Sequence, residues 1–200
     1  MEIDMIIGIT QHNDLCTRTA LGAPWVHIPD SGSVKGVTVM HDGSLLGIGM
    51  ENDLWRRASL SSPWVNIPHS GSVIGVAVMP DRTLLGIGLK NDLWTRASLS
   101  SPWVNIPNSG SVLGVAVRRD GIILGIGMKN DLWTRKTLSS PWVNIANSGS
   151  VKGVTFMEDG AILGIGMENE LFRRADGHSP WVHISHSGSV IGIANGNVHT

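Results

Sequence analysis

Residues 85–112 read LGIGLKNDLWTRASLSSPWVNIPNSGSV, and close copies of this stretch recur along the chain at one fixed spacing. A tryptophan that follows proline marks the phase of the repeat, and each lies 39 residues after the one before. These residues are Trp25, Trp64, Trp103, Trp142 and Trp181. Five such units fill nearly all of the 200 residues. A repeat of this length is one supersecondary unit that buries its apolar face by stacking on its neighbours.

Each unit is predicted to contain four short β-strands. Runs of apolar and β-branched residues alternate with clusters of Gly, Pro, Asn, Asp and Ser, which is typical of strands separated by turns. In the third copy the strands are expected at residues 73–79, 84–88, 92–96 and 103–106. The first of them is apolar at consecutive positions, which indicates a strand covered on both faces.

The link between the first and second strands is Asp-Gly in three copies, the signal of a two-residue hairpin. The third copy has Asp81-Arg82 instead. Either that turn is longer, or Arg82 adopts a strained backbone conformation.

The two ends of the chain complete each other. The chain starts with a second strand at residues 6–10 and finishes with a first strand at residues 190–194. An open stack of repeats needs polar capping units, and none is visible, whereas a closed ring removes the exposed sheet edges. We therefore predict an all-β, five-bladed β-propeller of four-stranded antiparallel blades. It forms one domain over residues 1–200, closed by the C-terminal strand joining the N-terminal blade.

Composition argues against several classes of partner. Fifteen basic and 16 acidic residues give a net charge of −1, without a basic stripe of the kind that binds phosphates, so nucleic acid is not expected. Apolar runs such as residues 162–167 are far shorter than the ~20 residues that span a bilayer, so no membrane insertion is expected. Cys16 is the only cysteine, and no signal peptide is visible at the N-terminus. We expect a cytoplasmic protein or one released by a non-classical route.

Neither metal nor catalytic chemistry is indicated. The eight histidines lack the spacings of zinc motifs, and no calcium-binding loop is present. A glycoside hydrolase needs two carboxylates in unlike environments at one site, whereas the acids here recur as near-identical fivefold sets. We expect a protein that is not an enzyme and that uses no cofactor.

The repeat resembles a known family. Its pattern W-V-N-I-P-x-S-G-S-V-x-G-V-A-V-x-x-D-G-x-I-L-G-I-G-x-x-N-D-L-W-x-R is similar to tectonin repeats, and the five-bladed plan looks like tachylectin. The blades of tachylectin are longer, and its Asn-Trp ligand segment has no clear counterpart here. Both families bind sugars, including N-acetylated hexosamines and lipopolysaccharide. The resemblance implies a multivalent lectin of the innate-immunity type for N-acetylglucosamine-like glycans.

The repeated tryptophan is the first candidate for sugar binding. Its flat face could stack on a pyranose ring while the indole N–H donates a hydrogen bond. The same side chain could instead pack as a wedge between adjacent blades. The third strand carries a tryptophan in the three middle copies, Trp55, Trp94 and Trp133, and Cys16 and Phe172 take its place in the end copies, which favours a core role for that position.

Two sets of polar residues are further candidates. An asparagine recurs between the second and third strands, where its amide could bind sugar hydroxyls or simply suit a left-handed turn. The position two residues after the repeated tryptophan is also polar and suits either a binding pocket or a solvated loop. The fifth position after the tryptophan, which is His69 after Trp64, allows the same two interpretations. The turn asparagines are Asn13, Asn52, Asn91, Asn130 and Asn169. The second set is Asn66, Asn105 and Asn144, with His27 and His183 in the end copies.

An acid follows each turn asparagine, and an arginine ends each third strand, five of each kind. We expect them to pair as a belt of salt bridges between blades. The arginines are Arg18, Arg57, Arg96, Arg135 and Arg174.

The favoured function is a multivalent carbohydrate-binding protein with up to five equivalent sites. Repetition would let weak sites act together on a glycan-coated surface. Two alternatives remain open: a propeller that serves as a protein-interaction scaffold, and an engineered or reconstructed repeat protein with no dedicated ligand.

Overall fold

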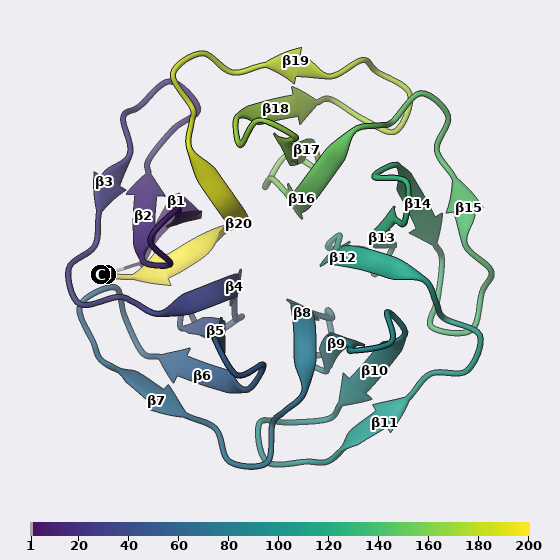
Figure 1. Ribbon diagram of the computed structural model, residues 1–200, viewed down its shortest axis with the longest axis horizontal. Helices are drawn as coiled ribbons and strands as arrows, with labels where there is room; N and C mark the ends of the chain where they lie inside the picture. Colours follow the sequence, from purple (N-terminus) through teal and green to yellow (C-terminus); the bar gives the residue numbers. More distant parts are fainter. Residues whose placement is uncertain (1) are drawn as a thin grey trace.

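Five antiparallel sheets surround a central axis in the computed structural model, which describes residues 2–200 (Figure 1). Each sheet has four strands, so the predicted five-bladed propeller is confirmed. In the third copy the predicted strand limits agree with the observed ones to within one residue. A helix with the length and apolarity needed to cross a membrane does not occur in residues 2–200.

In four blades the strands run outward from the axis in chain order, whereas in the closing blade the last strand of the chain is innermost and the first three strands lie outside it. The innermost strands are β4 (Val34–Val39), β8 (Val73–Val78), β12 (Val112–Val117), β16 (Val151–Phe156) and β20 (Val190–His199). The second strands are β1 (Glu2–Thr10), β5 (Leu45–Gly49), β9 (Leu84–Gly88), β13 (Ile123–Gly127) and β17 (Ile162–Gly166). The third are β2 (Leu15–Arg18), β6 (Leu54–Arg57), β10 (Leu93–Arg96), β14 (Leu132–Arg135) and β18 (Leu171–Arg174). The outermost are β3 (Val26–His27), β7 (Trp64–Asn66), β11 (Trp103–Asn105), β15 (Val143–Asn144) and β19 (Val182–His183).

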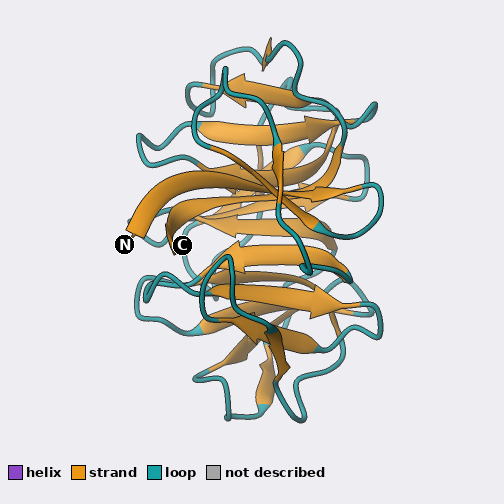
Figure 2. Ribbon diagram, turned by 90° about the vertical axis from the view of Figure 1, so that its left-hand side faces the viewer, coloured by secondary structure: helices purple, strands orange, loops and turns teal. Residues whose placement is uncertain are grey.

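The ring closes through the two ends of the chain, as predicted. β20 pairs with β1 in an antiparallel register that runs from Glu2 opposite His199 to Ile9 opposite Gly192. Both strands are longer than expected, because the residues that form a hairpin turn in the other blades continue here as paired strand. The described ends of the chain therefore lie side by side (Figure 2). The main-chain N–H of His199 also donates to Gly43 of the next blade, at 3.0 Å.

The second strands β5, β9, β13 and β17 are buried on both faces, as are residues 5–9 of β1, which explains their unbroken apolar sequences. Hydrophobic clusters span the junctions between blades; Ile48 and Leu54 of one blade, for example, pack with Val76 and Leu84 of the next. Glycine is required where the tryptophan of the outer strand enters. A Cβ on Gly86 would lie 2.8 Å from the ring of Trp103.

The hairpin at Asp81-Arg82 keeps the length of its counterparts. The N–H of Arg82 donates to Met79, and the N–H of Met79 to Thr83, both at 2.8 Å. Arg82 itself has a φ of 74°, in the left-handed region. Of the two alternatives, the strained conformation is the one observed.

Candidate functional site

The repeated tryptophan lies at the junction between two blades. Trp103 begins β11, and its indole N–H donates to the main-chain oxygen of Ser70, on the link from the preceding blade, at 2.8 Å. The other four tryptophans make the same bond, with distances of 2.7–2.9 Å. The wedge arrangement is therefore observed, and the indole N–H is already bonded within the protein. Only the ring surface remains to meet a ligand.

An arginine lies against each of these tryptophans. Arg96 is only 1% exposed, and its guanidinium carbon lies 5.7 Å from the ring centroid of Trp103. It donates to four main-chain carbonyl groups, of which His69 at 2.8 Å and Leu99 at 2.6 Å are the nearest. Burial lowers the pKa of Arg96, but an arginine remains charged at any ordinary pH.

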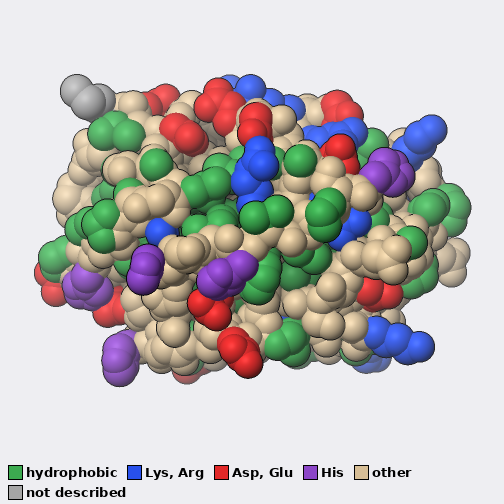
Figure 3. Space-filling model, turned by 90° about the horizontal axis from the view of Figure 1, so that it is seen from above, with side chains coloured by type: hydrophobic (Ala, Val, Ile, Leu, Met, Phe, Trp, Pro, Cys, Tyr) green, Lys and Arg blue, Asp and Glu red, His purple; other side chains and the backbone are tan. Residues whose placement is uncertain are grey.

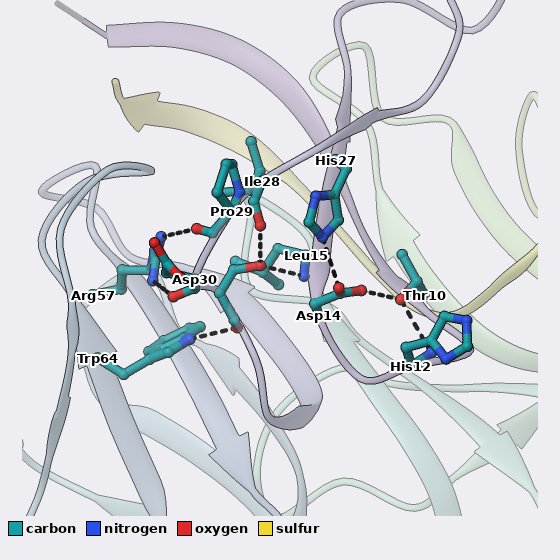
Figure 4. Close-up of polar contacts among 11 residues, drawn as sticks. Thr10, His12, Asp14, Leu15, His27, Ile28, Pro29, Asp30, Arg57 and Trp64 are labelled. Carbon is teal, nitrogen blue, oxygen red and sulfur yellow. Dashed lines mark hydrogen bonds and ion pairs between the residues drawn. The ribbon is translucent and has the colours of Figure 1, made fainter.

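The predicted belt of salt bridges is therefore wrong. Each of the five arginines is held by main-chain oxygens of the preceding blade rather than by a carboxylate. Figure 4 shows the junction of the first two blades, where Arg57 reaches Pro29 and Asp30 while Trp64 points toward the same link.

The acids pair with the polar position of the outer strand instead. Asp92 accepts hydrogen bonds from the indole of Trp94 at 3.0 Å and from the amide of Asn105 at 2.9 Å. Asn66 and Asn144 bond their acids in the same way. In the first blade the acid is Asp14, which bonds His27 at 2.7 Å and also accepts from Thr10 (Figure 4). In the fifth blade His183 bonds Glu170 at 2.8 Å.

The turn asparagines have a structural role. Asn91 has a φ of 65°, its main-chain oxygen accepts from Val112, and its amide donates to the oxygen of the same residue at 2.9 Å. Asn13 and Asn130 make the equivalent amide bonds, and all five asparagines have positive φ. The turn interpretation therefore describes the backbone of all five asparagines and the amide groups of Asn13, Asn91 and Asn130.

A groove opens between the second and third blades. It has a volume of about 500 Å³ and is bounded on one side by the link Pro68, His69 and Gly71 and on the other by residues 99–102. Trp103 and the buried Arg96 line it from within. The turn asparagines and the Asn66 set do not line it, so of the predicted sugar-binding residues only the tryptophan lies at the groove.

The serine loop and the arginine were not among the predicted site residues. Ser100 and Ser101 line the groove, and the hydroxyls of both lie within hydrogen-bond distance of Ser98, at 3.3 and 2.7 Å. A signal was available, because a hydroxyl-rich loop precedes proline in the three middle copies. The residue at the position of His69 changes from blade to blade, which makes the five junctions unequal: Asp30, His69, Asn108, Asn147 and His186.

Within residues 2–200 no group of three or more His, Cys, Asp or Glu side chains is placed to hold a metal ion. Burial raises the pKa of the Cys16 thiol to about 12, so this cysteine is not a reactive thiolate at neutral pH.

Comparison with known proteins shows the fold of the chain alone. No protein-family model matches the chain, and no curated protein matches it. Among solved structures it is similar to a protein described under "The de novo evolutionary emergence of a symmetrical protein is shaped by folding constraints". The TM-score is 0.62 and the identity 12%, over 95% of this chain and 93% of that one.

Two further structures are similar at a lower level. A protein of unknown function from Bacteroides caccae matches with a TM-score of 0.51 and 9% identity, over 86% of this chain and 69% of that one. A structure described as YCF48 bound to D1 peptide matches with a TM-score of 0.50 and 16% identity, over 87% and 61%. At these identities the likeness shows a shared β-propeller fold alone. The resemblance to tectonin and tachylectin receives no support from these matches.

Proposed function

We propose that this protein is a non-enzymatic, multivalent carbohydrate-binding propeller whose sites are the grooves between neighbouring blades. The observation that carries the proposal is the groove between the second and third blades, which combines the ring of Trp103 with the hydroxyls of Ser100 and Ser101. A sugar presents an apolar face and a rim of hydroxyl groups. The indole ring can pack against the apolar face, and the serine hydroxyls can hydrogen-bond with the rim. Its volume of about 500 Å³ lies in the range of small-molecule sites.

An N-acetylated hexosamine fits this arrangement. Leu99, Pro102 and the indole of Trp103 offer apolar surface for the acetamido methyl group, while the serine hydroxyls and His69 offer hydrogen bonds to ring hydroxyls. The groove-lining carbonyls of Pro68 and His69 already accept bonds from Arg96. Specificity therefore rests on the exposed side chains rather than on the main chain.

The arrangement of five junctions in one ring can raise the overall affinity for a glycan-coated surface above that of a single weak site. The buried arginine, the tryptophan and its bond to the preceding link recur at all five junctions. A surface that displays many copies of one glycan can engage several grooves at once, and avidity of this kind can exceed single-site affinity by roughly 10² to 10⁴. Because the residue at the position of His69 varies, we expect the five affinities to differ.

The test is a broad glycan array followed by an NMR titration with the best free sugar. We expect the amide signals of Gly71 and Ser100 and of their counterparts at other junctions to shift together with sugar concentration. Ser100→Phe should fill one groove and abolish the shifts at that junction alone. Glu51→Phe, on an exposed turn outside the groove, is the matched control and should leave every site intact. The proposal fails if no sugar binds, or if Ser100→Phe leaves the shifts at Gly71 unchanged.

A scaffold function is the second candidate. A ring of half-exposed valines on the outermost strands offers apolar contacts to another polypeptide: Val26, Val65, Val104, Val143 and Val182 are 57–61% exposed. The structure of YCF48, which is similar in fold, is described as bound to a peptide. A scaffold would bind one protein at one-to-one stoichiometry and ignore free sugars, so the same titration separates the two functions.

The third alternative, a repeat protein with no dedicated ligand, fits the likeness to a symmetrical protein. It predicts that no binding is detected in either the sugar or the protein assay.

A further inference from the structure

A second cavity lies on the axis of the ring. The five innermost strands enclose a channel of about 580 Å³. Its wall along the strands combines polar residues such as Thr38, Thr155 and Asn195 with apolar ones. Each blade contributes one branched aliphatic residue that is 7–8% exposed: Val37, Val76, Val115, Val154 and Ile193. The inner strands that carry this wall are those nearest the centre of Figure 1.

The channel opens among the hairpin turns that join the first and second strands, and here the fivefold symmetry breaks. Arg118 lines the opening where the other tight-turn copies have Met40, Met79 and Met157. The next position is Arg119 in one copy and Glu158 in the neighbouring one. The closing blade has no hairpin at this place and contributes Glu2 and Asp4 from β1. A ligand bound here would be held once per chain and not five times.

The charges of the opening do not balance. Its lining includes two arginines, Arg118 and Arg119, against the five acids Glu2, Asp4, Asp120, Glu158 and Asp159. Both arginines are already paired. Arg118 lies 2.7 Å from Asp120, and Arg119 lies 3.2 Å from Glu158. The surface around the ring likewise mixes acidic and basic side chains, which gather along the upper edge in Figure 3.

Asp4 is the acid without a basic partner. Its carboxylate accepts a hydrogen bond from the amide of Asn195, at 3.4 Å, and no Lys, Arg or His side chain of residues 2–200 lies within 4 Å of it. Asp4 is exposed; partial desolvation and the nearby charge of Glu158 raise its pKa, while the hydrogen bond from Asn195 and the charge of Arg119 act in the opposite direction. Arg119 pairs with Glu158 and lies more than 4 Å from the carboxylate of Asp4, so a second positive charge placed beside Asp4 would further reduce the repulsion between the two acids.

We propose that the mouth of the channel binds one organic cation per chain, a primary ammonium with an apolar substituent. The ammonium group lies beside Asp4 and Glu158, and the apolar chain extends between Val115, Val154 and Ile193. A compact ammonium adds a close ion pair to the exposed carboxylate of Asp4, and the branched side chains of the channel remove part of the apolar substituent from water. A bare metal ion fits less well, since the described residues include no group of three metal-ligating side chains. An anion would meet arginines that are already neutralised.

The test uses hexylammonium as the probe and isothermal titration of the full chain at neutral pH and low salt. We expect one site per chain, with hexanol much weaker and hexanoate without binding. Asp4→Asn should weaken binding by about tenfold, which corresponds to removing one close charge pair near the surface. Asp30→Asn is the matched control, because it removes the same charge at a junction far from the channel lining and at a left-handed position that asparagine tolerates.

Raising the salt concentration should weaken the ammonium probe and leave hexanol unaffected. The proposal is overturned if hexanoate binds as well as hexylammonium, if Asp4→Asn binds as tightly as the wild type, or if none of the probes binds at millimolar concentration. Ser100→Phe, which fills a sugar groove, should leave this site unchanged. Failure of the glycan proposal and failure of the channel proposal can therefore be told apart.

Discussion

The guanidinium of Arg96 lies over the ring of Trp103, and the two side chains donate to adjacent carbonyl groups of the preceding blade, those of His69 and Ser70. One buried pair thus fixes the position of two blades relative to each other. The same pair recurs at each junction, with separations of 5.3–5.7 Å. Both walls of the groove between the second and third blades depend on this contact.

Replacing the buried arginine is expected to destabilise the ring strongly. Arg96→Met leaves carbonyl groups without donors in a buried position, and we expect the free energy of unfolding to fall by about 3 kcal/mol. Arg96→Lys should recover part of this, since lysine keeps the charge but not the planar fork. Urea unfolding at pH 7 measures both. Arg119→Met, at an exposed ion pair, should change stability by less than about 0.5 kcal/mol. Equal losses in the two Met variants would show that the hydrogen bonds of Arg96 do not stabilise the ring.

A methyl group at Gly86 is expected to push the blades apart. The added Cβ would lie 2.8 Å from the ring of Trp103, so Gly86→Ala should cost about 1–3 kcal/mol through overpacking. Gly22 has no atom within 4 Å of an added Cβ, and Gly22→Ala is the matched control, expected within about 0.5 kcal/mol of the wild type. Thermal unfolding of the two variants decides the matter. A tolerated alanine at position 86 would mean that the ring of Trp103 can move.

The hairpin at position 82 offers a stabilising change. Arg82 has a φ of 74°, where a side chain is strained, so Arg82→Gly should stabilise the protein by about 0.5–1 kcal/mol. Gly160 occupies the corresponding turn of the fifth blade with a φ of 85° and open space around it. Gly160→Ala should therefore destabilise by about 1 kcal/mol through backbone strain alone. Chemical denaturation should move the two midpoints in opposite directions, and shifts of the same sign would refute this account.

Asp42 is expected to make stability depend on acid pH. Burial by itself would raise its pKa, but hydrogen bonds from Ser44 and the charge of Arg56 outweigh that effect and lower the pKa from 3.8 to about 2. A depressed pKa in the folded state adds stability above pH 4, and this contribution is lost as the pH falls through 2. The carboxylate is half exposed, so solvent screening limits the effect to less than about 1 kcal/mol.

Asp42→Asn should accordingly be less stable than the wild type at pH 7 and nearly equal to it at pH 2. Urea midpoints at the two pH values provide the comparison. An equal difference at both would show that the side chain acts through its shape and not its charge.

The strands, the turns and the closure of the ring could be read from the repeat because each depends on local chemistry. Asp-Gly hairpins, the apolar run of β8 and the incomplete first and last units all leave marks in the sequence. The sequence also indicated that the turn at Arg82 is either longer or strained, although only the φ of Arg82 decides between these alternatives.

The partners of the arginines could not be read in this way. Equal numbers of acids and arginines suggested ion pairs, but Arg96 is bound by main-chain oxygens. Every residue has a main-chain oxygen, so the sequence does not indicate which of them an arginine will contact. The grooves were missed for a related reason. Their walls come from two blades, so Ser100 and His69 meet only because of the angle at which one sheet packs against the next.

The pairing of β1 with β20 also orders events during synthesis. β1 emerges from the ribosome before any other strand of the ring, yet its inner neighbour is translated after all the rest. Four complete sheets can form while the first still lacks one side. The sheet that contains β1 therefore keeps an unpaired strand edge until β20 has been synthesised. A nascent chain that stalls before β20 is the species most exposed to wrong strand pairing with a second copy of itself.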